Sequence, residues 1–148
     1  MQTTRSLVWG LEPKSFERLT IVAAIRKELN RVIRKTEINV SDDLRGMYRL
    51  HLPNSTKILV YRIMQEAIDN SVCHTLSTEM LIETQRRNGC LCVEISDNGC
   101  GFNPFAMEES MHCGLTLMKE RTKMVGGTFS IESKPDSGTK VSFAVPIS

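Results

Sequence analysis

The chain has 148 residues, of which 41% are hydrophobic and 24% are charged, a size and balance typical of one folded domain. A net charge of +2 and an aromatic content of 5% do not support a nucleic-acid-binding protein, and no apolar run approaches the roughly 18 residues of a membrane span. The start shows no signal-peptide pattern, and the cysteines have no regular spacing. We therefore expect a cytoplasmic domain with reduced thiols that contacts neither nucleic acid nor membrane.

Apolar residues recur at three- and four-residue spacing in several segments, and this pattern predicts amphipathic helices. The first of these looks like the end of a longer helix, which Pro13 terminates. A cap at Asn54 or Ser55 opens the third, and Gly126-Gly127 ends the last. The predicted helices cover residues 3–11, 14–34, 54–73 and 114–125.

Alternation of apolar and polar residues predicts about six strands. The two strands nearest the N-terminus are expected to pair as a hairpin, and Asn88-Gly89 is a strong signal for another. Together with the helices, this pattern predicts a two-layer α+β sandwich, with helices on one face of a mostly antiparallel mixed sheet. The predicted strands lie near residues 37–40, 47–52, 79–86, 90–97, 129–131 and 141–145.

Asp97 stands where a strand should place an apolar residue. The apolar side chains of residues 90–97 share the inward face of their strand, and Asp97 is the next residue in that row. Burying a carboxylate without a hydrogen-bond donor is costly, so a donor must be supplied. Two sources remain open: a donor within the protein, or a ligand such as a purine with its exocyclic amino group. Gly99 and Gly101 follow directly and would let the backbone approach a ligand closely.

Glu66 and Asn70 lie four residues apart in the predicted helix 54–73 and therefore share one face. Such a polar face is often simply solvated. An amide oxygen beside a carboxylate nevertheless suits Mg²⁺, which prefers oxygen ligands, and the carboxylate could also act as a general base.

Two further stretches have a binding character. Gly114 is expected at the start of the helix 114–125, where exposed amide groups and the helix dipole favour an anion. Thr139 shares the inward face of the last strand with apolar residues, so its hydroxyl also needs a partner.

These stretches, read in order as EAIDN, DNGCGF, CGLTLM and SGTKV, resemble the N, G1 and G2 boxes and the final glycine–threonine motif of the ATP-binding domain of sensor histidine kinases. That domain belongs to the wider GHKL ATPase group and has the Bergerat fold. The segment from Gly114 to Ile147 is similar to the subfamily whose partners are LuxR-type response regulators. The resemblance covers about residues 5–147, and the set of motifs is far more specific than any one of them.

The resemblance implies a role for each matching residue at the adenine end. Asp97 would accept a hydrogen bond from the adenine amino group, which would explain its inward position. Thr139 would lie beside Asp97 and help hold adenine, and Gly99 and Gly101 would line the same end.

The resemblance also implies the residues of the phosphate end. Asn70 would coordinate the Mg²⁺ of Mg·ATP, and Glu66 would be the base or polarising group for phosphoryl transfer. Gly114, with Leu115 next to it, would meet the phosphates, and residues 102–113 would form the lid over ATP. Cys73 stands where the family often has a lysine, so His74 or Lys119 would have to replace that phosphate contact.

None of the three histidines, each with its following residue, fits the acceptor motif of the family, so the resemblance implies a catalytic fragment. Residues 1–12 would be the end of a dimerisation helix and linker, and 13–148 the ATP-binding domain. The full protein would be a homodimeric, membrane-attached sensor kinase that passes phosphate from its acceptor histidine to a response regulator. Two alternatives stay open: a GHKL protein-serine kinase of the anti-sigma-factor type, and a catalytically silent nucleotide-binding docking module.

Overall fold

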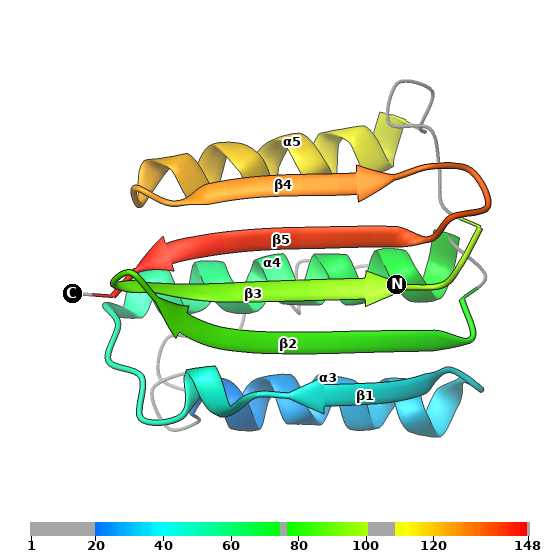
Figure 1. The fold of residues 1–148 in the computed structure, drawn as a ribbon, viewed down its shortest axis with the longest axis horizontal. Helices are drawn as coiled ribbons and strands as arrows, with labels where there is room; N and C mark the ends of the chain where they lie inside the picture. The colour runs from blue at the N-terminus through cyan, green and yellow to red at the C-terminus, as the bar shows by residue number, and fades with distance from the viewer. Residues whose placement is uncertain (1–19, 75–76, 101–108, 148) are drawn as a thin grey trace.

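The computed structural model describes residues 20–74, 77–100 and 109–147, so the predicted helix over residues 3–11 lies outside the described part. A five-stranded sheet with the order β1-β2-β3-β5-β4 forms one layer, and the helices form the other, all on one face of the sheet (Figure 1). The elements are α3 (Ile21–Lys35), β1 (Asn39–Asp43), η1 (Arg45–Met47), α4 (Asn54–His74), β2 (Glu79–Arg87), β3 (Cys90–Asp97), α5 (Glu109–Met124), β4 (Thr128–Ser133) and β5 (Thr139–Pro146).

The core lies between the two layers. In β3 the alternate residues Leu91, Val93 and Ile95 are buried, and in β5 the row from Val141 to Val145 is buried in the same way. The helices contribute a matching apolar side, in which Ile25, Leu29, Ile63, Met64 and Ile68 are almost fully buried. Burial of this continuous apolar surface is the main term that stabilises the fold. The predicted two-layer α+β sandwich is therefore confirmed.

Local sequence signals set several element ends, although α3 begins at Ile21 and not at the predicted residue 14. The Thr20 hydroxyl caps α3 by accepting a hydrogen bond from the Ala23 amide at 3.1 Å. Gly126 adopts a left-handed conformation with φ of 80°, and its amide donates to the Lys123 carbonyl, which ends α5. Asn88 and Gly89 both have positive φ and join β2 to β3 as the expected antiparallel hairpin.

The predicted strand over residues 47–52 is wrong, and so is its hairpin with the preceding strand. β1 pairs with β2 in parallel, and the chain then turns through η1. Gly46 comes so close to β2 that a side chain there would meet the Gln85 backbone nitrogen at 2.6 Å, and its amide donates to Thr84 Oγ1 at 2.9 Å. This contact between residues far apart in the sequence overrides the local alternation, and Tyr48 is left 49% exposed.

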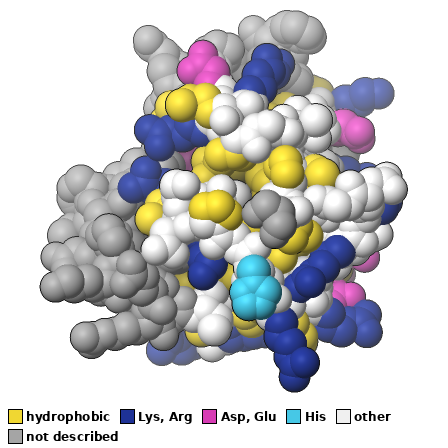
Figure 2. Space-filling view, turned by 90° about the vertical axis from the view of Figure 1, so that its left-hand side faces the viewer, with side chains coloured by type: hydrophobic (Ala, Val, Ile, Leu, Met, Phe, Trp, Pro, Cys, Tyr) yellow, Lys and Arg dark blue, Asp and Glu magenta, His cyan; other side chains and the backbone are white. Residues whose placement is uncertain are grey.

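Along the sheet, β3 points its C-terminal end toward the start of β5, and the β2–β3 hairpin lies at the opposite end of the molecule (Figure 1). Figure 2 shows that hairpin end, where lysine and arginine side chains stand around a mixed polar and apolar surface. In the part of the chain that the structure describes, no helix combines the length and apolar character needed to cross a membrane.

Candidate functional site

Asp97 is held by two donors from the protein. The Ser71 hydroxyl donates to Asp97 Oδ2 at 2.7 Å, and the Gly99 amide donates to Oδ1 at 2.8 Å. The first of the two explanations for an inward carboxylate therefore applies in this structure. It does not exclude the second, because an ionised carboxylate has about four lone-pair sites and these two bonds use half of them.

Thr139 lies directly beside Asp97. The two residues are paired in the antiparallel register of β3 and β5, and Thr139 is 9% exposed on the inward face of β5. Its hydroxyl oxygen is 2.9 Å from that of Ser133 on β4. The predicted proximity of Asp97 and Thr139 is thus present, and it follows from strand register alone.

The backbone around Asp97 is fixed by two residues that sequence reasoning did not single out for this purpose. The side-chain oxygen Oδ1 of Asn98 accepts hydrogen bonds from the backbone amides of Thr78 and Glu79, both at 2.9 Å, and this ties the end of β3 to the start of β2. Gly138 has φ of 78°, and a side chain there would collide with the Asp97 carbonyl. The asparagine of DNG and the glycine of SGT therefore hold Asp97 in position.

Glu66 and Asn70 share one side of α4, as predicted, but Glu66 is not on a solvated face. It is 4% exposed, because α5 packs over it at Gly114. Arg62 lies one turn before Glu66, and its pKa is lowered by burial and by the positive charge of Arg121 on α5. The Glu66 carboxylate therefore lies at a closed contact between α4 and α5.

α5 begins at Glu109 and not at Gly114, so the predicted helix start is wrong. Gly114 lies in the second turn, where its amide is part of the helix rather than an exposed donor. Of the other predicted residues, Gly101 and most of the lid lie outside the described residues, as do the side chains of His74 and Leu115. Of the predicted residues, the structure places Asp97, Gly99 and Thr139 side by side, whereas Glu66 and Asn70 share one side of α4.

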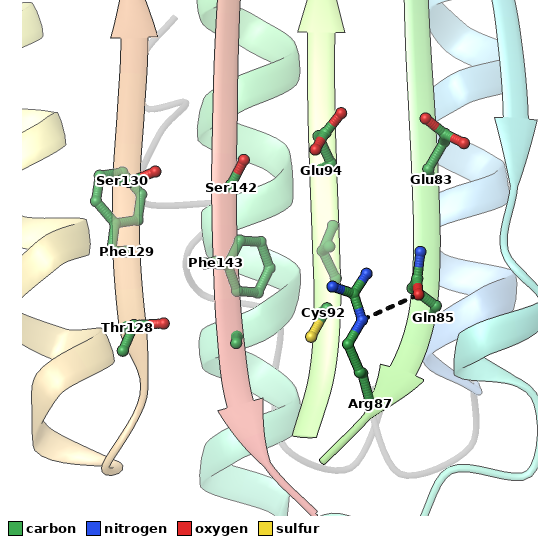
Figure 3. A pocket seen from close by; sticks show the side chains of 12 residues that line it. Glu83, Gln85, Arg87, Cys92, Glu94, Thr128, Phe129, Ser130, Ser142 and Phe143 are labelled. Carbon is green, nitrogen blue, oxygen red and sulfur yellow. Dashed lines mark hydrogen bonds between the residues drawn. The ribbon is translucent and has the colours of Figure 1, made fainter. Parts of the chain in front are cut away.

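The sheet face without helices has a separate hollow of about 320 Å³. Figure 3 shows its lining of polar and apolar side chains, in which Arg87 donates to Gln85 at 3.2 Å near the hairpin end of β2 and β3. None of the predicted site residues lines this hollow. It is therefore distinct from the Asp97 site, whose side chains face the helices.

Residues 55–148 match the family described as histidine kinase-, DNA gyrase B-, and HSP90-like ATPase. This match covers well over half of the chain and includes every residue of the Asp97 site. The chain belongs to this ATPase family. The same assignment implies that the domain binds ATP.

Proteins similar to this ATPase domain include sensor proteins of staphylococci. This chain is 32% identical over 143 residues to the sensor protein VraS of Staphylococcus saprophyticus and 30% identical to VraS of Staphylococcus aureus strain COL. Each alignment covers 97% of this chain but 40% of the relative, so the chain spans less than half the length of these relatives.

Solved histidine kinases share the fold of this ATPase domain. The kinase domain of the blue-light activated histidine kinase EL346 from Erythrobacter litoralis superposes with a TM-score of 0.67 at 17% identity, covering 86% of this chain and 65% of that one. Histidine kinase AdeS from Acinetobacter baumannii gives a TM-score of 0.65 at 14% identity, covering 86% and 63%.

Ser71 belongs to the candidate site of this ATPase domain but was not predicted from the sequence motifs. We expect Ser71→Ala to weaken ADP binding roughly three- to tenfold, because Asp97 loses one donor and its carboxylate becomes less well oriented. Calorimetric titration with ADP measures the effect. Ser77→Ala is the control, since Ser77 is buried nearby but donates to the Ser71 carbonyl and not to Asp97. An equal loss of affinity in both variants would contradict a specific role for the Ser71 hydroxyl.

Proposed function

We propose that this chain is the catalytic ATP-binding domain of a two-component sensor histidine kinase. It would bind Mg·ATP and transfer the γ-phosphate to a histidine on a dimerisation helix that this chain does not contain. The observation that carries the proposal is the convergence of Ser71, Asp97 and Thr139, with Glu66 and Asn70 on the same helix as Ser71. The similarity to sensor proteins favours this function over the serine-kinase and docking-module alternatives.

At the adenine end, Asp97 accepts the exocyclic amino group, and the adjacent Thr139 hydroxyl helps to orient the ring. Gly99, which is buried, and Gly101 line this end and leave room for the base. Because Ser71 and Gly99 already orient the carboxylate, little reorganisation is needed when the base binds.

At the phosphate end, Asn70 holds Mg²⁺, which neutralises charge on the phosphates and takes its remaining ligands from phosphate oxygens and water. Glu66 polarises the incoming histidine or accepts its proton, and its burial away from water strengthens this interaction. Leu115, His74 and residues 102–113 complete the cover of the phosphates. Gly114 lines the phosphate end next to Glu66, where α4 and α5 meet.

The proposal extends to the longer protein. Residues 1–12 would join a dimerisation helix to the ATP-binding domain of residues 13–148, in a homodimer attached to the membrane through other segments. The partner would be a response regulator of the LuxR type, as the segment after Gly114 suggests. Incubating this chain with Mg·ATP and the dimerisation domain of the same protein tests the proposal. Phosphate that appears on a histidine supports it, and phosphate on serine would contradict it.

Removal of the metal is expected to weaken binding at the phosphate end of the site and to leave binding at the adenine end unchanged. With EDTA in excess, we expect ATP affinity to fall about tenfold or more while adenosine affinity stays within twofold, because only the phosphates need the cation. Asn70→Ala should show the same weak ATP binding even with Mg²⁺ present. Calorimetry with both ligands makes the comparison. Asn30→Ala on α3 is the control, since Asn30 is exposed and far from α4's polar side. Metal-independent ATP binding would contradict the role of Asn70.

A further inference from the structure

Gly114 occupies a position where glycine is unfavourable. It is the sixth residue of α5 and has an ordinary helical conformation rather than a positive φ. Glycine in a helix interior destabilises the helix relative to alanine, because its backbone loses more freedom on folding. Since neither a turn nor a helix end requires glycine here, the reason must lie in what surrounds it.

The surroundings of Gly114 are the side chain of Glu66. A Cβ atom on Gly114 would lie 2.7 Å from Glu66 Oε1, 3.5 Å from Cδ and 3.8 Å from Cγ. The three atoms nearest to that position all belong to the Glu66 side chain, so its carboxylate occupies the space that glycine leaves open. Carbon and oxygen do not approach to 2.7 Å without a shift of one of them, and the mobile end of Glu66 is what would shift.

We propose that Gly114 is a positioning residue for Glu66: the missing side chain makes a seat for the carboxylate between α4 and α5. The backbone of α5 then closes over Glu66 and sets the direction of its carboxylate. This inference rests on the proposed role of Glu66 in phosphoryl transfer. It assigns Gly114 a function that acts through Glu66, separate from any direct contact with phosphate.

A double-mutant cycle on folding stability tests the contact between Gly114 and the Glu66 carboxylate and does not require an active enzyme. In a Glu66→Ala background, Gly114→Ala should raise the folding equilibrium constant roughly two- to fivefold, since alanine is the better helix former and nothing obstructs it. In the background that keeps Glu66, this gain should disappear. Urea unfolding of the four chains gives both values. Thr116→Ala, at an exposed position of the same helix, should have the same effect in both backgrounds. An equal effect of Gly114→Ala in both backgrounds would overturn the proposal.

A kinetic measurement tests the consequence for the reaction. Gly114→Ala should lower kcat for transfer to the acceptor domain about tenfold or more, because a displaced carboxylate no longer meets the reacting group. KM for ATP should stay within twofold. A raised KM with unchanged kcat would mean that Gly114 contacts phosphate and would overturn the proposal, as would unchanged kinetics. If the chain with Gly114 and Glu66 bound no nucleotide, the proposed function would fail, whereas the stability cycle would still report on the seat.

Discussion

Asp97→Asn is expected to weaken ADP binding about 100-fold while leaving the fold intact. The amide keeps the shape of the carboxylate but has one acceptor oxygen, and the Gly99 amide already requires an acceptor at this point. The amide nitrogen would then face the adenine amino group, so two donors would meet without an acceptor. Loss of a hydrogen bond to a charged group costs about 1.5–3 kcal/mol, and an unpaired donor in the closed site adds to it.

Calorimetry with ADP and thermal unfolding of the same samples check this expectation together. Glu94→Gln is the matched control, since Glu94 lies on the same strand but on the face without helices, 3.8 Å from Lys140. It changes a carboxylate to an amide without touching the site and should bind ADP normally. If Asp97→Asn bound ADP as well as the unmodified chain, Asp97 would have only the structural role that its two internal donors already show.

Glu66→Gln is expected to slow phosphoryl transfer while leaving ATP affinity nearly unchanged. ATP affinity should stay within about threefold, because the isosteric amide fits the seat at Gly114. Transfer of phosphate to the acceptor histidine should fall roughly 100-fold or more, since the group that polarises or deprotonates the nucleophile is lost. The rate of acceptor phosphorylation at saturating ATP measures the effect, and calorimetry measures the affinity.

Asp69→Asn provides the comparison within the same helix. Asp69 lies on the side of α4 that faces α3, with its carboxylate 3.3 Å from Arg31, and its replacement should leave the transfer rate unchanged. A fully active Glu66→Gln would exclude Glu66 as the base. A variant that no longer binds ATP would instead assign Glu66 to the binding of the nucleotide.

The predictions that the structure confirms depend mainly on interactions between residues that are close in the sequence. The Asn88-Gly89 turn depends on two residues that accept positive φ, and the inward position of Asp97 depends only on the alternation of a strand. The adjacency of Asp97 and Thr139 needed one further step, the antiparallel pairing of two strands whose apolar rows were clear.

Contacts between distant segments account for the errors and omissions. The expected strand over residues 47–52 is lost because Gly46 packs on the backbone of β2, about forty positions along the chain. Ser71 could not be recognised as a partner of Asp97, 26 residues away, without knowing how α4 lies on the sheet. The burial of Glu66 likewise depends on α5, whose true start at Glu109 has no clear local signal.

The 21-residue helix α4 also fixes the spacing between residues of the candidate site. It carries both Glu66 and Ser71, the partner of Asp97, and their separation of five residues corresponds to a rise of about 7.5 Å along the helix axis. Under the proposed function, one rigid helix would therefore set the spacing between Glu66 and the Asp97 end of the site. An inserted or deleted residue between positions 66 and 71 would rotate either Glu66 or Ser71 away from the site by about 100°, so we expect it to impair the site as a whole.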